Sequence, residues 1–145
     1  MTAPELALHC RGRFEALEAA GRRAGFEQIR QGIIDHTDLY EVVGYEARLA
    51  EPRGFHDGLS LRITFVSFPQ PAVSFLLQWT SWMADPSMKI RADFPPLVVK
   101  QTILSGKQAA RIQPLADRYL ELLAGEIARR EPPGFLARWW LRLVG

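Results

Sequence analysis

The segment 59–82, with the sequence LSLRITFVSFPQPAVSFLLQWTSW, constrains the fold of this chain more than any other. Apolar residues occupy alternate positions on both sides of a turn that is bounded by Pro69 and Pro71. Successive side chains of a β-strand point to opposite faces, so this alternation predicts two strands that each have an apolar and a polar face. We therefore expect a sheet whose apolar face lies in the core and whose polar face meets water.

Flanking segments extend this sheet. Residues 39–50 carry apolar side chains at most odd positions, with Glu41 as the exception, and residues 88–94 also alternate. Segment 26–34 alternates less regularly. Residues 97–104 are rich in β-branched side chains, which favours a strand, although the two prolines before them would also suit the start of a helix. We expect four to six antiparallel strands in meander order.

The turns between these strands set the register that we expect. Hairpins centred on the Pro-Arg-Gly-Phe loop, on Gln70 and on Asp85-Pro86 would align side chains in rows across the sheet. The two apolar rows are Val43, Phe65, Phe75 and Phe94, and Ala47, Leu61, Trp79 and Ile90. The polar row on the other face is Glu46, Arg62, Gln78 and Arg91.

Two helices are expected to cover the apolar face. Thr2 and Glu5 have the spacing of a capping box, and an apolar stripe runs from there through 4–24 to Gly25, a typical C-terminal cap. A second stripe predicts a helix over 107–130. The expected fold class is α+β, an antiparallel meander sheet with N-terminal and C-terminal helices packed on one face.

Composition narrows the class of protein. The length of 145 residues suits one domain, which we place at 1–131, followed by a short amphipathic helix at 132–145. Cys10 is the one cysteine, so no intrachain disulfide forms, which favours a reducing cytoplasm. We expect neither a signal peptide nor a membrane span. The net charge of +2, with arginines spread along the chain, argues against nucleic-acid binding.

Two histidines beside aspartates are the candidates for chemistry. His36 lies between Asp35 and Asp38, and His56 precedes Asp57. Such pairs suit acid–base catalysis or metal binding, but the same residues occur in turns for backbone hydrogen bonding alone. The strands that follow the two histidines would start at opposite ends of an antiparallel pair, which disfavours a joint site. No complete phosphate-binding loop or zinc-protease motif is present, and we expect no metal and no cofactor.

The last segment offers a candidate contact surface. An apolar face with tryptophans beside arginines suits a groove on a partner protein, a membrane surface, or folding back onto the core of the chain. The candidate contact residues are Phe135, Arg138, Trp139, Trp140 and Arg142.

A pocket between the sheet and the helices is a further possibility, because curved sheets with helices on one face often leave a cavity there. A filled core is the simpler alternative, since nothing in the apolar rows calls for a charged or polar ligand group. The candidate pocket residues are Tyr45, Phe65, Phe75, Trp79 and Phe94.

Three functions stay open. The first is a bacterial-type, non-catalytic binding or adaptor protein that contacts an unknown protein partner through the C-terminal Trp/Arg helix or the polar sheet face. The second is a carrier of a small apolar ligand, with its pocket between sheet and helices. The third is an enzyme that uses His36 or His56 with an adjacent aspartate. The expected location is the cytoplasm, with weak membrane contact through the C-terminal helix as an alternative.

Overall fold

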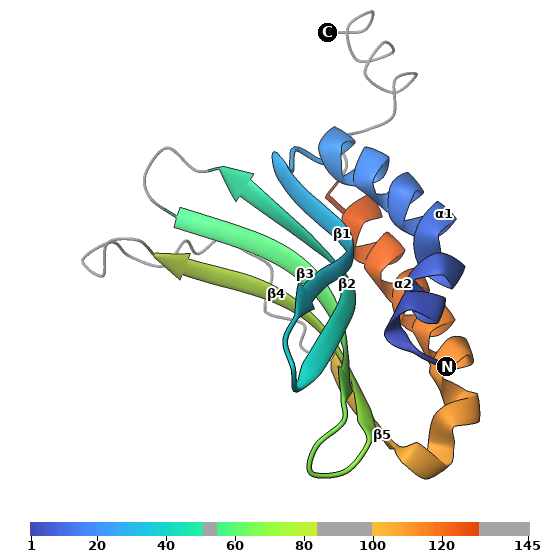
Figure 1. Ribbon diagram of the computed structural model, residues 1–145. Coiled ribbons are helices and arrows are strands. Elements are labelled where there is room, and N and C mark those ends of the chain that lie inside the picture. The colour runs from blue at the N-terminus through green and yellow to red at the C-terminus, as the bar shows by residue number, and fades with distance from the viewer. Residues whose placement is uncertain (51–54, 84–99, 131–145) are drawn as a thin grey trace, which may run out of the picture.

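The computed structural model describes residues 1–50, 55–83 and 100–130. In this part of the chain, the strands form one antiparallel sheet in the order β1-β2-β3-β4-β5. Both helices lie on the same side of the sheet (Figure 1), which confirms the predicted α+β class and meander order. The elements are α1 (Ala3–Arg23), β1 (Gln28–His36), β2 (Tyr40–Ala50), β3 (Phe55–Val66), β4 (Ala72–Met83), β5 (Lys100–Ser105), the 3₁₀-helix η1 (Gly106–Arg111) and α2 (Ile112–Ala128).

Helix α1 begins and ends at the predicted signals. The Glu5 N–H donates to Thr2 Oγ1 (3.3 Å), and the Thr2 N–H donates to the Glu5 carboxylate (3.0 Å), which completes the capping box. At the other end, Gly25 has a φ of 97°, and the Phe26 N–H donates to the Gly21 carbonyl (3.0 Å), as in a Schellman motif. The buried stripe is Ala3, Leu6, Cys10, Phe14, Leu17 and Gly21.

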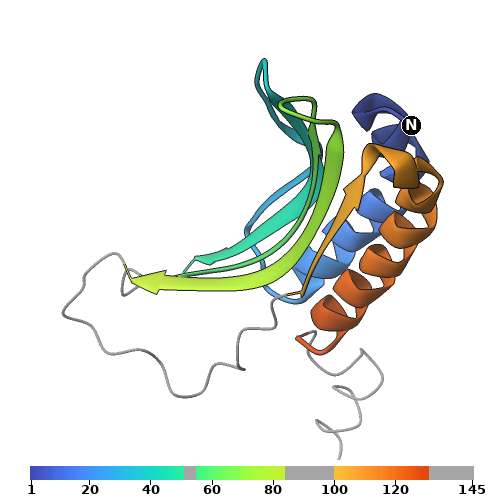
Figure 2. The ribbon, with the colours of Figure 1, turned by 90° about the horizontal axis from the view of Figure 1, so that it is seen from below.

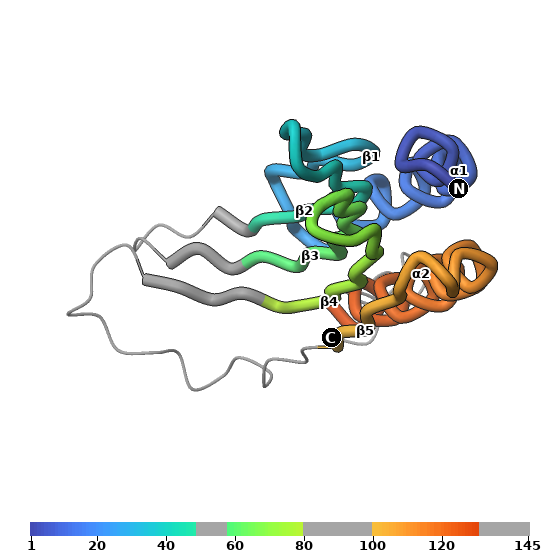
Figure 3. Tube along the Cα trace, turned by 60° about the horizontal axis from the view of Figure 1, so that its bottom comes forward, coloured from blue at the N-terminus to red at the C-terminus, as the bar shows by residue number. Residues whose placement is uncertain are grey.

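The sheet bends away from the helices, which lie along its convex side (Figure 2). Helix α1 packs against β1 and β2, and α2 packs against β3 and β4. Figure 3 shows the two helices beside different halves of the sheet. Most odd-numbered residues of β2, β3 and β4 are buried on the helix side, as predicted. The polar face is concave (Figure 2), and Val42 and Ser60 are buried there as well.

The register differs from the predicted one by two residues in both central hairpins. Ala47 pairs with Leu59 and not with Leu61, and Phe75 pairs with Ile63 and not with Phe65. Each hairpin centre lies one residue earlier than expected, and moving a centre by one residue shifts every partner by two. An even shift leaves all side chains on the same face. The predicted faces are therefore right although the predicted rows are wrong.

The polar row changes with the register. Glu46 pairs with Ser60, which pairs in turn with Gln78, whereas Arg62 lies between Gly44 and Leu76. A Cβ atom on Gly44 would collide with the carbonyl oxygen of Leu61, so the curvature at this point of the sheet requires a glycine. Arg91, the fourth residue of the predicted row, lies outside the described residues.

Two element boundaries also differ from the prediction. Strand β3 begins at Phe55, before the alternating segment 59–82 in which it was expected, so the sheet extends farther than predicted. The predicted second helix starts as the 3₁₀-helix η1 and becomes α-helical from Ile112. Strand β5 settles the alternative at 97–104 in favour of a strand over its described part. The expected strand 88–94 lies outside the described residues, but its predicted pairing of Phe94 with Phe75 is wrong, because Phe75 pairs with Thr102 of β5.

Candidate functional site

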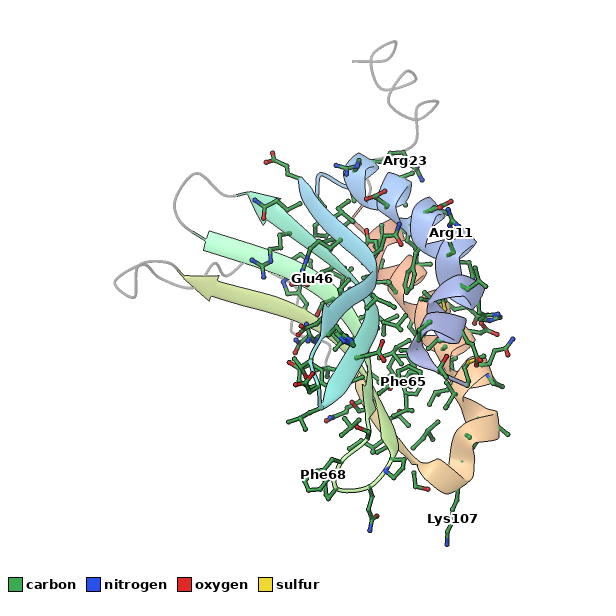
Figure 4. The ribbon with its side chains drawn as sticks, in the orientation of Figure 1. Arg11, Arg23, Glu46, Phe65, Phe68 and Lys107 are labelled. Atoms are coloured by element: carbon green, nitrogen blue, oxygen red, sulfur yellow. The ribbon has the colours of Figure 1, made fainter. Side chains whose placement is uncertain are left out.

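A cleft of about 580 Å³ opens between the sheet and the helices, at the end of the molecule where α1 begins. It is bounded by residues 36–41 of the β1–β2 hairpin, by residues 65–67 and 71–73 around the β3–β4 turn, and by the starts of α1 and η1. Figure 4 marks Phe65 between sheet and helices and Phe68 on the turn at the same end. The sheet and both helices therefore contribute to one concave site.

A β-bulge in β1 places two polar side chains at this cleft. The pairing of β1 with β2 shifts between Ile33 and Asp35, so His36 stands opposite Glu41. Glu41 in turn pairs with Phe65 on the face that packs against the helices. The His36 ring lies with Nδ1 3.6 Å from the Glu41 carboxylate, and the two side chains are 67% and 35% exposed. The residue that broke the apolar alternation in the sequence is thus a lining residue of the cleft.

The aspartate next to His36 has other partners. The Tyr40 hydroxyl donates to Asp35 Oδ2 (3.3 Å), and an Arg62 nitrogen lies 3.6 Å from the same oxygen. The backbone N–H of His36 donates to Asp35 Oδ1 (2.9 Å). These contacts hold the end of the hairpin together. The histidine–aspartate pair expected at residues 35 and 36 is therefore a structural arrangement, and the ring of His36 faces a glutamate instead.

His56 stands far from His36. It pairs with Ala50 at one end of β2, whereas His36 pairs with Glu41 at the other end. Nine residues of strand separate these positions, which corresponds to about 30 Å. The two histidines do not share a site, as the antiparallel topology predicted. Among the residues that the structure describes, no group of three or more His, Cys, Asp or Glu side chains is arranged to hold a metal ion.

The concave face of the sheet carries a second polar cluster. The Glu46 carboxylate contacts Arg30 at 2.5 Å and Arg48 at 3.1 Å, and these residues border a depression of about 180 Å³ with Gln28. Burial alone would raise the pKa of Glu46, but hydrogen bonds and charge from the two arginines outweigh it and lower the pKa. Glu46 is therefore a stable anion between two cations.

A third polar cluster joins the two helices. Arg13 contacts Asp117 at 2.6 Å, and His9 Nε2 lies 2.9 Å from the same carboxylate oxygen. The side-chain amide of Gln113 lies 3.2 Å from His9 Nδ1. An Arg13 nitrogen also lies 2.9 Å from His9 Nε2, so the four side chains form one connected polar cluster. His9, with a side chain that is 28% exposed, is thus part of a clamp between α1 and α2.

Cys10 lies buried beside this clamp. Burial is the main cause that raises the pKa of its thiol to about 11. A thiol of this kind is protonated at neutral pH and unreactive. Cys10 is thus a small residue of the hydrophobic core.

The predicted pocket residues divide between core and cleft. Phe65 lines the cleft, whereas Tyr45, Phe75 and Trp79 fill the core. The Tyr45 hydroxyl donates to the Leu17 carbonyl (2.8 Å), the Phe75 ring lies 5.3 Å from Tyr119, and the Trp79 ring packs against Phe26 and Arg130. Phe94 and the C-terminal contact residues Phe135, Arg138, Trp139, Trp140 and Arg142 lie outside the described residues.

Comparison of the chain with protein-family models, curated proteins and solved structures finds no match. Within the described ranges, no helix is long and apolar enough to cross a membrane.

Proposed function

We propose that this protein is a non-catalytic binding protein that holds a small molecule with an apolar body in the cleft between its sheet and its helices. The observation that carries this proposal is the cleft itself. Its volume of about 580 Å³ is typical of ligand sites, which commonly measure about 300–1,000 Å³. Apolar walls with a few convergent polar groups are also typical of such sites.

The walls of the cleft fit an apolar ligand body. Phe65, Val73 and Ile112 line it from the sheet and from the start of α2. Met1 and Leu39, which also line it, are exposed to solvent by 44% and 59%. Large apolar side chains that remain exposed around a concave site favour contact with another molecule.

The polar pair at the mouth favours binding over catalysis. The distance of 3.6 Å between His36 and Glu41 exceeds a hydrogen bond. Both groups therefore have free capacity for a ligand and are not assembled into a proton relay with each other.

Replacing either of two neighbouring alanines on η1 with tryptophan tests the proposal. Ala109 lines the cleft and Ala110 does not, although both are exposed. Ala109→Trp would fill the cleft, and Ala110→Trp is the matched control. Binding of a fluorescent naphthalene dye is measured by titration and by native mass spectrometry. We expect the parent and A110W to bind the dye, and A109W to bind it at least about tenfold more weakly. Equal binding by the two variants would contradict the proposal.

A second candidate is contact with a protein partner through the concave face or the C-terminal helix. The observation that favours the concave face is its set of Arg30, Glu46, Arg48 and Arg62, since charged groups on a concave surface give orientation and specificity to protein contacts. Pull-downs would compare the parent with R30A/R48A, with the α1 control R11A and with a chain ending at Arg130. Identical partners for all four would exclude both surfaces.

A further inference from the structure

We infer that the ligand of the cleft is an amphipathic cation, namely an ammonium group attached to a hydrocarbon or aromatic body. This inference rests on the proposed function of the cleft and adds the chemical class of its ligand. Three features of the described residues carry it: the sign of the charged side chains in the cleft, the isolation of Glu41 from arginine, and the apolar surface beside Glu41.

The charged side chains of the cleft are acidic. Asp38 and Glu41 line it, together with His36, and no lysine or arginine is among its described lining residues. Lys107 lies at the same end of the molecule but points away from the cleft into solvent (Figure 4). Met1, which carries the positively charged α-amino group, also lines the cleft, but the two carboxylates outnumber this one cation. The excess of negative charge favours a positive ligand.

Glu41 differs from other partly buried carboxylates of the described chain in its partners. Glu46 lies between two arginines, Glu126 also contacts two, and Asp117 contacts Arg13 and His9. Glu41, whose side chain on the inner face is 35% exposed, has only His36 as a charged partner, at 3.6 Å, in the described part of the chain. A carboxylate in an apolar wall is stabilised by a cation, and here the protein supplies no guanidinium. A bound ammonium group would complete the pair.

The position of Glu41 fixes how such a ligand would lie. Cross-strand pairing places Glu41 beside Phe65, and Phe65 beside Val73, in one row on the helix side of the sheet. An ammonium group at the carboxylate would thus lead directly onto the apolar wall. The ligand would bury its hydrocarbon or aromatic body against that wall while its head stays at the mouth, where the Glu41 side chain is 35% exposed.

Three probes of equal length test the inference on the full chain: octylammonium, octanol and octanoate, each below its aggregation concentration. Titration calorimetry is expected to show that octylammonium binds most tightly and octanoate most weakly. Glu41→Gln keeps the shape of the side chain and removes its charge. It should weaken octylammonium binding by about tenfold and leave octanol binding unchanged. Glu121→Gln, an exposed change on α2 outside the cleft, is the control and should change neither.

The outcomes separate the ligand class from the binding function. If octanol binds to the parent and not to A109W, but E41Q leaves octylammonium affinity unchanged, the cation preference is overturned and the cleft remains a binding site. If no probe binds to the parent, the inference and the proposed function both fail. A loss of octylammonium binding that occurs equally in E121Q would also overturn the assignment to Glu41.

Discussion

At the scale of single residues, a glycine decides how closely α1 approaches the sheet. Gly21 faces Tyr45 of β2, whose buried hydroxyl donates to the Leu17 carbonyl at 2.8 Å. A Cβ atom at position 21 would collide with that hydroxyl. The apolar stripe of the helix predicts that position 21 is buried. It does not show that the side chain packed against this position is a tyrosine from a strand about twenty residues later.

The first prediction concerns this contact. Gly21→Ala should lower the free energy of unfolding by about 1–3 kcal/mol, because Tyr45 must move and weaken its hydrogen bond to Leu17. Gly12→Ala, on the same helix, is the matched control, since an added Cβ there meets no atom within 4 Å. It should stabilise the protein by about 0.5–1 kcal/mol through helix propensity alone. Urea denaturation measures both, and equal effects of the two changes would refute the role of Gly21.

At the scale of elements, local signals were predictable and pairing details were not. The ends of α1 follow from its caps, and the inner and outer faces of the strands follow from alternation. The register depends on where each turn is centred, and the Pro-Arg-Gly-Phe loop and the segment around Gln70 allow neighbouring centres with the same alternation. The bulge after Ile33 could not be foreseen, because the apolar pattern of β1 is irregular and fits several pairings.

The second prediction concerns the clamp between the two helices. Burial opposes ionisation of Asp117, but hydrogen bonds from His9 and Arg13 outweigh it, so the pKa of this carboxyl is below its ordinary value of 3.8. A carboxyl group whose pKa is lowered by folding stabilises the folded state at pH values above its ordinary pKa. This contribution is lost as the pH falls through the lowered pKa. Asp117→Asn should therefore cost about 0.5 kcal/mol at pH 7, since the pair is partly exposed, and progressively less below about pH 4.

Urea denaturation of parent and D117N at pH 7, 4 and 3 measures this difference. Glu15→Gln is a useful control, because Glu15 contacts Arg11 on the exposed side of α1 and does not join the helices. A stability difference for D117N that stayed constant over the three pH values would show that the carboxylate does not act through its charge.

At the scale of the whole molecule, the candidate site lies where a strand departs from its alternation of apolar and polar residues. Alternation in β2 predicts an apolar residue at position 41, and the protein has a glutamate there that lines the cleft. The sequence therefore contained a signal for the site, namely Glu41 as the exception in its strand. The cleft around Glu41 was not predictable, because its walls come from a bulge in β1, from the β3–β4 turn and from η1. Deviations of this kind are expected where function opposes stability.

The opposition between ligand binding and stability at position 41 gives the third prediction. Glu41→Leu restores the apolar row and places leucine opposite Phe65, a cross-strand pair that contributes about 0.2–1 kcal/mol. The variant should unfold at higher urea concentration than the parent and bind octylammonium at least about tenfold more weakly. Glu121→Leu on the exposed face of α2 adds the same apolar side chain away from the cleft and should leave binding unchanged. If E41L were less stable than the parent, Glu41 would be a structural residue of the hairpin, and the argument that the fold tolerates it for the sake of a ligand would fail.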